Sequence, residues 1–178
     1  MSIATVASRY AKSLIELAKE KNLVDQVYQD MLLFKNTAAE NRELTSILGS
    51  PIVRHEKKLN ILEGLFKSKV NPVSYTIFEI VTRKNRESIL EPIAQEFVKL
   101  YDLHKGIQKA TIISSSALTE ENRKQIVSVL EQSSGKTIQL TEKVDESLIG
   151  GCILRVDDKQ VDASIKSQLS RLKLKMLA

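Results

Sequence analysis

The sequence predicts two domains, an all-α six-helix bundle over residues 1–105 followed by a small α+β domain over residues 106–178. Apolar residues recur at the helical period through the first part, whereas short alternating runs and two helical segments make up the second. The aromatic residues support the same division, because none follows Tyr101 and Gly106 comes shortly after it. A chain of 178 residues has the length of one medium domain or two small ones.

Six helical segments are expected in the first part. Their apolar residues recur every three or four positions, and proline, glycine and asparagine mark several of their ends. Pro72 falls in a first helical turn, where its missing N–H costs nothing, and Asn85 suits a left-handed turn after the fifth segment. The expected segments are residues 3–21, 23–39, 42–48, 55–66, 72–84 and 88–105.

The first and fifth of these helices carry more apolar surface than a single core contact needs. In the first, a stripe of large apolar residues lies beside a stripe of alanines, and together they cover about half of the helix. In the fifth, Tyr75 and Phe78 extend the apolar face well beyond its main stripe. Two interpretations follow: these are the central helices of the bundle, or they border a groove that accepts an amphipathic helix from another protein.

The second part predicts a small mixed domain. Strands are expected at residues 107–114, 137–143 and 152–156, with the third joined to the second by a tight hairpin that contains Gly150 and Gly151. Thr119 is a predicted helix N-cap, and Gly135 is the predicted end of that helix. After a turn at residues 157–159, a last helix is expected over residues 161–177, with Ile165, Leu169, Leu172 and Met176 on its inner face.

Residue types that could carry chemistry form no catalytic or metal-binding pattern. There is one cysteine, and the two histidines, His55 and His104, lie far apart in the sequence. The run Gly135-Lys136-Thr137 matches part of a phosphate loop, but it leads from a helix into a strand, the reverse of the order that phosphate binding needs. We therefore expect no catalytic residue, no metal ligand and no cofactor.

The net charge of +5 permits nucleic acid, an anionic membrane surface or an acidic partner, and selects none of them. The second part has no aromatic side chain on which a base could stack, which argues against a nucleic-acid-binding sheet. No stretch has the length of a membrane span. A basic RNA- or membrane-surface-binding protein is the alternative to an interaction module.

Residues 144–156, followed by residues 161–165 and 168–172, resemble the C-terminal signature of the ATP synthase delta subunit family, called oligomycin-sensitivity-conferring protein in mitochondria. Residues 7–14 resemble the opening helix of that family, and the run from Phe78 through Arg86 to Tyr101 falls in the expected order. Asn85, Asp157 and Ala163 stand where the family commonly has glycine, which affects only local turn geometry. The signature positions matched are Leu148, Ile149, Gly150, Gly151, Arg155, Asp162 and Ser164.

The resemblance implies a non-enzymatic subunit of the peripheral stalk, or stator, of an F-type proton-transporting ATP synthase. It implies that the bundle holds the N-terminal helix of an alpha subunit, that the second domain meets the end of the b-subunit stalk, and that rotor torque thereby drives ATP synthesis. It also implies no nucleic acid and contact with the membrane only through the complex, at the cytoplasmic face of a bacterial plasma membrane. The expected alpha-subunit contacts are Tyr10, Ala11, Leu14, Ile77 and Ile80, and the expected stalk contacts are Leu169, Leu172 and Met176.

Overall fold

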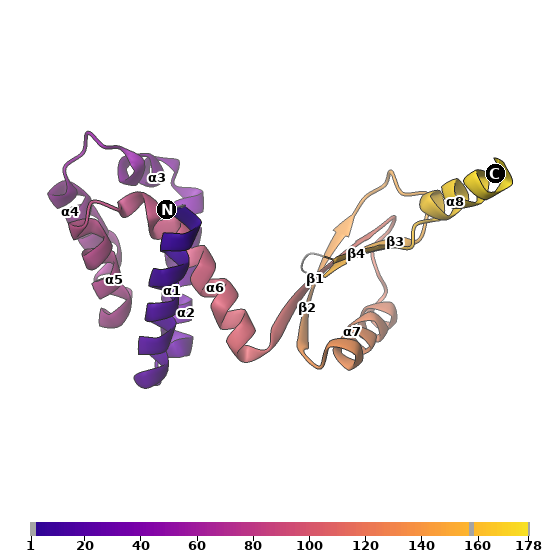
Figure 1. Cartoon of the computed structure of the whole chain (residues 1–178), viewed down its shortest axis with the longest axis horizontal. Coiled ribbons are helices and arrows are strands. Elements are labelled where there is room, and N and C mark those ends of the chain that lie inside the picture. The colour runs from indigo at the N-terminus through magenta and orange to yellow at the C-terminus, as the bar shows by residue number, and fades with distance from the viewer. Residues whose placement is uncertain (1–2, 157–158, 178) are drawn as a thin grey trace. The chain divides into compact units, whose positions relative to one another are not determined.

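A computed structural model describes residues 3–156 and 159–177, and the chain divides into two compact units, Met1–Asp102 and Leu103–Ala178 (Figure 1). The expected boundary at Gly106 lies close to this division. The first unit is helical and the second contains the sheet, so the fold class predicted from the sequence is confirmed. No helix in the described ranges is long and apolar enough to cross a membrane.

Six α-helices and one short 3-10 helix begin within the described part of the first unit, close to the positions that the apolar period predicts. Asn71 caps the fifth helix, since its side chain accepts a hydrogen bond from the Val73 amide at 3.0 Å. Asn85 has a positive φ of 53° in the turn that follows. The helices are α1 (Ile3–Glu20), α2 (Val24–Glu40), α3 (Arg42–Gly49), α4 (His55–Phe66), α5 (Pro72–Arg83), η1 (Glu87–Ile89) and α6 (Leu90–Lys105).

Three aromatic rings from different helices meet in the core of the helical unit. The ring centroid of Phe34 lies 5.3 Å from that of Phe66 and 4.9 Å from that of Phe78, and the last two are 5.8 Å apart. All three side chains are almost completely buried. The separations suit tilted and edge-on aromatic packing, which adds to the stabilisation from burial. This cluster joins α2, α4 and α5.

A second aromatic contact joins α2 to α6. Tyr28 and Tyr101 are stacked with their ring centroids 3.8 Å apart. The Tyr101 hydroxyl donates a hydrogen bond of 2.7 Å to Asp25 Oδ1. That hydrogen bond, together with burial, raises the pKa of Tyr101 to about 12, so the phenol stays protonated and keeps donating.

One buried ion pair connects α4 to η1. Lys58 Nζ lies 3.5 Å from Glu87 Oε2 and donates a 3.0 Å hydrogen bond to the Leu48 carbonyl oxygen. Both charged side chains are 5% exposed. Lys58 therefore holds the end of α3 and the start of η1 together, at the place where the chain leaves α3.

The second unit contains a four-stranded sheet with the order β2-β1-β3-β4. Strand β1 pairs with β2 in parallel and with β3 in antiparallel register, and β3 and β4 form an antiparallel pair. The parallel pair is joined through α7, as a crossover connection requires. The elements are β1 (Ile107–Ser114), α7 (Glu120–Ser134), β2 (Thr137–Val144), β3 (Cys152–Val156), β4 (Lys159–Asp162) and α8 (Ile165–Leu177).

Both predicted ends of α7 are confirmed. Thr119 Oγ1 accepts a hydrogen bond from the Asn122 amide at 3.3 Å, which caps the first turn. Gly135 ends the helix in the left-handed conformation, with φ 65°.

Two expectations for the second unit are wrong. The third strand does not form a hairpin with the second, because the partner of β3 is β1: Ile112 lies opposite Leu154 in the antiparallel register. The last helix does not begin at Val161, which lies in β4, but at Ile165. Strand β4 has one apolar residue among its four, so the sequence shows no alternating pattern there. Of the expected turn, Asp157 and Asp158 lie outside the described residues, and Lys159 begins β4.

Candidate functional site

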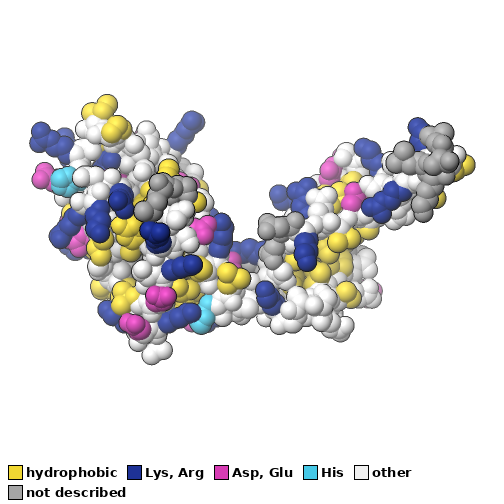
Figure 2. Space-filling model, viewed as in Figure 1, with side chains coloured by type: hydrophobic (Ala, Val, Ile, Leu, Met, Phe, Trp, Pro, Cys, Tyr) yellow, Lys and Arg dark blue, Asp and Glu magenta, His cyan; other side chains and the backbone are white. Residues whose placement is uncertain are grey.

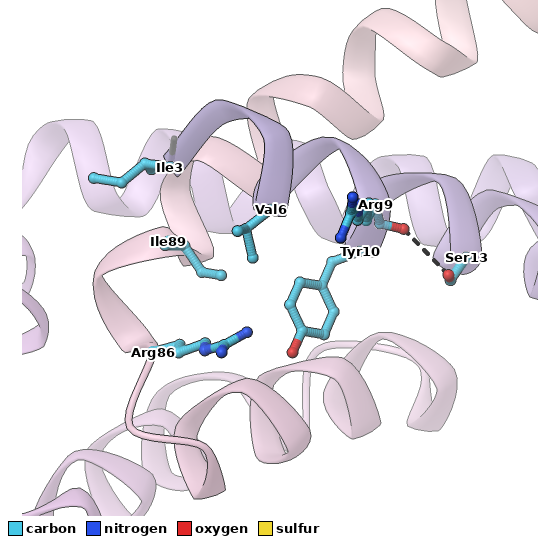
Figure 3. Close-up of a pocket in the computed structure, with 7 residues that line it drawn as sticks. All are labelled: Ile3, Val6, Arg9, Tyr10, Ser13, Arg86 and Ile89. Carbon is cyan, nitrogen blue, oxygen red and sulfur yellow. Dashed lines mark hydrogen bonds between the residues drawn. The ribbon is translucent and has the colours of Figure 1, made fainter. Parts of the chain in front are cut away.

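The helical unit has a cavity of about 510 Å³ beside α1. Figure 3 shows Val6 and Tyr10 of α1, Ile89 of η1 and Arg86 pointing toward one another across this space. The lining is mostly apolar, with arginine side chains at its margin. The residues that line it are Ile3, Val6, Arg9, Tyr10, Ser13, Arg86 and Ile89.

The cavity exists because α1 is apolar over a wider arc than the core can cover. Ala7 and Ala11 have no exposed surface, and their small side chains let the neighbouring helices approach closely. Val6 and Tyr10 lie at the edge of that face and are half-buried, while Ile3 is 60% exposed. The same helix therefore supplies both the core and one wall of the cavity.

Arg86 reaches the cavity through the turn that ends α5. The Asn85 amide donates to the Thr82 carbonyl oxygen at 2.9 Å, and the Arg86 amide donates to that of Val81 at 3.1 Å. The left-handed conformation of Asn85 reverses the chain so that Arg86 precedes η1. Asparagine tolerates this conformation better than most residues that have a side chain.

The five expected alpha-subunit contacts occupy different environments. Tyr10 lines the cavity and is half-buried, and Ile80 is 39% exposed on α5. Ala11, Leu14 and Ile77 are 0%, 2% and 9% exposed and belong to the core of the bundle. Side chains this deeply buried offer almost no surface to a partner in this conformation, so the structure places these three residues in the core of the bundle.

Other residues of the cavity were not among the expected contacts. Val6 belongs to the apolar stripe of the first helix, and its spacing of four from Tyr10 placed both on one face. Arg86 and Ile89 could not be found by spacing within one helix, because they come from the segment between α5 and α6. Only the packing of that segment against α1 brings them to the site.

Helix α8 of the second unit carries an exposed apolar face. Ile165, Leu169, Leu172 and Met176 are 42%, 54%, 55% and 86% exposed. All three expected stalk contacts therefore lie at the surface, although the sequence predicted an inner face for them. Four large apolar side chains in one row are more than scattered surface residues account for, and such patches mark interaction sites.

Asp162 fixes the start of α8. Its Oδ1 accepts a hydrogen bond from the Ser164 amide at 2.9 Å, and its Oδ2 accepts one from the Ser167 hydroxyl at 2.7 Å. These bonds from Ser164 and Ser167 lower the pKa of the Asp162 carboxyl to about 2. Of the matched signature residues, Ser164 caps α8, since its Oγ accepts a hydrogen bond from the Ser167 amide at 3.3 Å, and Asp162 holds the same turn in place.

Gly150 and Gly151 also serve the start of α8, which corrects the hairpin role expected for them. Gly151 has φ 78°, and a Cβ there would lie 2.4 Å from the Ala163 carbonyl oxygen. A Cβ at Gly150 would lie 2.8 Å from Ile165 Cδ1. The Ile165 amide donates to the Gly150 carbonyl oxygen at 3.0 Å. The two glycines let this segment pass close to residues 163–165.

The other signature residues have local roles. The Leu148 amide donates to the Asp145 carbonyl oxygen at 3.1 Å, which closes the turn after β2. Ile149 is 72% exposed. Arg155 Nε donates to Gln160 Oε1 at 2.9 Å across the β3–β4 pair. These residues shape the segment that leads to α8.

No group of three or more His, Cys, Asp or Glu side chains suited to a metal ion occurs among residues 3–156 and 159–177.

Figure 2 shows hydrophobic side chains among Lys and Arg on the viewed face of the helical unit. An apolar cavity on one unit and an exposed apolar helix face on the other are surfaces of the kind that proteins use for contacts with other proteins.

The chain belongs to the ATP synthase delta (OSCP) subunit family, whose model matches residues 6–176. It is 35% identical over 175 residues to the ATP synthase subunit delta of Cytophaga hutchinsonii, covering 98% of this chain and 96% of that one. It is 36% identical over 173 residues to the ATP synthase subunit delta of Flavobacterium psychrophilum, covering 97% of each.

The fold also matches a solved structure. A chain in the cryo-EM structure of the Toxoplasma gondii mitochondrial ATP synthase hexamer superimposes with a TM-score of 0.74, covering 97% of both chains. The two sequences are 24% identical, so this likeness concerns the fold.

Proposed function

We propose that the helical unit binds the N-terminal helix of an ATP synthase alpha subunit in the cavity beside α1, and that α8 binds the end of the b-subunit stalk. As a member of the delta (OSCP) family, the chain is a non-catalytic stator component of a proton-transporting ATP synthase. In that position it links the catalytic head to the stalk, so that the torque of the rotor drives ATP synthesis instead of turning the head.

The observation that carries the first contact is the apolar cavity at Tyr10. Val6 and Tyr10 are only half-buried by the chain itself, and Ile80 is 39% exposed on α5. An amphipathic helix presents apolar side chains at positions i, i+3, i+4 and i+7, which is the pattern that fills such a groove. Such an occupant would take these side chains out of water, and that burial supplies the binding free energy.

Two modest contacts on one molecule are sufficient to keep the catalytic head linked to the stalk during rotation. Once one contact has formed, the other partner is held near its site, and the second contact forms at a high effective concentration. The chain would then act from the cytoplasmic face of a bacterial plasma membrane, held there by the complex.

The two contacts can be separated by truncation. Removal of residues 165–178 is expected to abolish binding to the soluble part of the b subunit and to leave binding to the catalytic head unchanged. Because Ile165 packs against Gly150, the double variant Leu169→Asp/Leu172→Asp should accompany the truncation, with Val129→Asp on α7 as an exposed apolar control. Stalk binding that persists in the truncated chain contradicts the assignment of α8.

A salt titration distinguishes this function from the binding of RNA or anionic membranes. Binding to phosphates weakens steeply as salt releases and replaces counterions, whereas burial of apolar surface in a groove is little affected. We expect the affinity for an alpha-subunit N-terminal peptide to change less than about threefold between low and physiological salt, a bound set by the weak screening of apolar contacts. A loss of several orders of magnitude would favour a phosphate ligand.

A further inference from the structure

We infer that α8 docks as one strand of a short coiled coil and that its partner helix carries carboxylates beside the seam. This inference rests on the proposed stalk contact and specifies the chemistry of the partner. It combines three observations on α8: the spacing of its exposed apolar residues, the position of its lysines and the absence of acids from its sequence.

The apolar face of α8 has the spacing of a coiled-coil seam. Ile165, Leu169, Leu172 and Met176 follow one another at intervals of four, three and four residues. This is the heptad pattern in which Leu169 and Met176 occupy a positions and Ile165 and Leu172 occupy d positions. All four side chains are exposed, so the seam has no partner helix within the described residues.

Two lysines of α8 occupy positions that flank the seam of a coiled coil and contact the partner helix. In this heptad frame, Lys166 and Lys173 occupy the two e positions, directly after the d residues Ile165 and Leu172. Side chains at e and g positions meet the flanks of the facing helix and set partner choice and orientation. Both lysines are exposed and neither forms a salt bridge with a described residue, although Lys166 lies near enough to Asp145 to help lower the pKa of that carboxyl. They are available to carboxylates of another chain.

Helix α8 itself contains no acidic residue. The last acidic residue of the chain is Asp162, which precedes α8 and accepts hydrogen bonds from Ser164 and Ser167. Lys and Arg side chains are seen along α8 in Figure 2. A second copy of α8 is a poor partner, since an antiparallel pair would place lysine opposite lysine at the e positions.

An anionic membrane is the other surface that attracts basic amphipathic helices. The apolar side of α8 is a single row of four residues rather than a broad face, and no aromatic residue follows Tyr101 to sit at a lipid interface. Helix α8 has 13 residues, which is long enough for about two heptads of a coiled-coil contact. A facing helix with apolar a and d positions would cover the narrow apolar row of α8, and acidic residues on its flanks would pair with the lysines beside that row.

The test measures binding of the full chain to the soluble part of the b subunit from the same organism. In Lys166→Glu/Lys173→Glu we expect the affinity to fall about tenfold and its salt dependence to reverse, because two attractive flank pairs become repulsive. The double variant Lys124→Glu/Lys136→Glu makes the same change of net charge away from α8 and should bind within about twofold of the unchanged chain. Leu169→Asp should abolish binding through the seam itself.

Rescue by the partner gives the decisive result. Replacing the acidic residues that flank the apolar stripe of the b segment with lysine should weaken binding to the unchanged chain and restore binding to Lys166→Glu/Lys173→Glu. If the charge-reversed chain instead binds like its control while Leu169→Asp binds poorly, the acidic-flank inference is overturned and the stalk contact stands. If neither variant matters, the seam is not the docking surface.

If the unchanged chain does not bind the b segment at all, the proposed stalk contact fails and the inference fails with it. Sedimentation with phosphatidylglycerol vesicles measures whether the chain binds an anionic membrane instead. Binding of the chain to vesicles, lost in Lys166→Glu/Lys173→Glu and unaccompanied by binding to the b segment, would assign α8 to a lipid surface and overturn the coiled coil.

Discussion

Ser74 donates a 2.6 Å hydrogen bond to Asp30 Oδ2, and this pair ties the middle of α2 to the first turn of α5. The same carboxylate oxygen accepts a 2.8 Å hydrogen bond from the Asn71 amide, one of the amides that precede the helix. Asp30 is 8% exposed and Ser74 is completely buried. The carboxylate therefore stabilises the start of α5 from a neighbouring helix, and it helps to place the helix that carries Ile80.

Replacement of Asp30 by alanine should destabilise the helical unit by about 2–3 kcal/mol, the cost of losing hydrogen bonds to a charged group and leaving buried donors unpaired. Urea denaturation followed by circular dichroism measures this change. Glu20→Ala, at the exposed end of α1, is the control and should alter stability by less than about 0.5 kcal/mol. An Asp30→Ala protein as stable as this control would show that the α2–α5 bonds are dispensable.

A charged residue in the proposed groove should block the alpha-subunit helix without unfolding the bundle. Ile80→Asp is expected to weaken binding of an alpha N-terminal peptide at least about tenfold, because a carboxylate would be desolvated in an apolar contact. Tyr10→Asp should act in the same direction. Titration calorimetry measures the affinity, and thermal unfolding establishes that the fold is retained.

Leu65→Asp is a matched control for this experiment, since Leu65 on α4 is 38% exposed and Ile80 is 39% exposed. The control should bind the peptide as the unchanged chain does. Equal weakening by Leu65→Asp and Ile80→Asp would mean that general destabilisation, not the groove, explains the loss.

Replacing only Glu87 of the buried Lys58–Glu87 pair should destabilise the protein more than replacing both residues. Glu87→Leu alone leaves a buried ammonium without its carboxylate and should cost about 3–5 kcal/mol. The double variant Lys58→Met/Glu87→Leu should recover most of this loss, because an apolar pair of similar size avoids the desolvation of two charges. A double-mutant cycle in urea tests the coupling, and additive effects would contradict it.

Asp162 should give the start of α8 a pH dependence at acid pH. Its pKa of about 2 lies below the ordinary value of 3.8, so the folded state favours the ionised carboxylate. The resulting stabilisation is fully present above pH 4 and is lost as the pH falls through about 2. NMR titration of the Ser164 amide, which donates to Asp162 Oδ1, should show a midpoint near this value.

Asp162→Asn keeps a side-chain oxygen that can accept from the Ser164 amide but removes the titrating group, so the acid transition of that amide should disappear while the helix stays ordered at neutral pH. Asp162→Ala should fray the first turn of α8 at neutral pH as well. An amide midpoint near 4 in the unchanged chain would contradict the role of the ionised carboxylate as the acceptor of these bonds.

The sequence by itself determined the elements whose signals are local. The helical period located all six helices of the bundle, Asn71-Pro72 and Thr119 marked two helix starts, and Gly135 marked a helix end. It also located the apolar stripe of α8, because the spacing of Leu169, Leu172 and Met176 is a property of one helix, but it wrongly expected that stripe to face inward.

Tertiary structure decided everything that depends on which elements become neighbours. The pairing of β3 with β1 rather than β2 is a choice among sheet edges, and no local pattern records it. The division of the apolar arc of α1 is of the same kind: Ala11 and Leu14 became core while Tyr10 kept exposed surface, because other helices cover one side of the arc and leave the other open. Hydrophobicity specifies that a face is buried, but packing decides whether the chain itself or a partner does the burying.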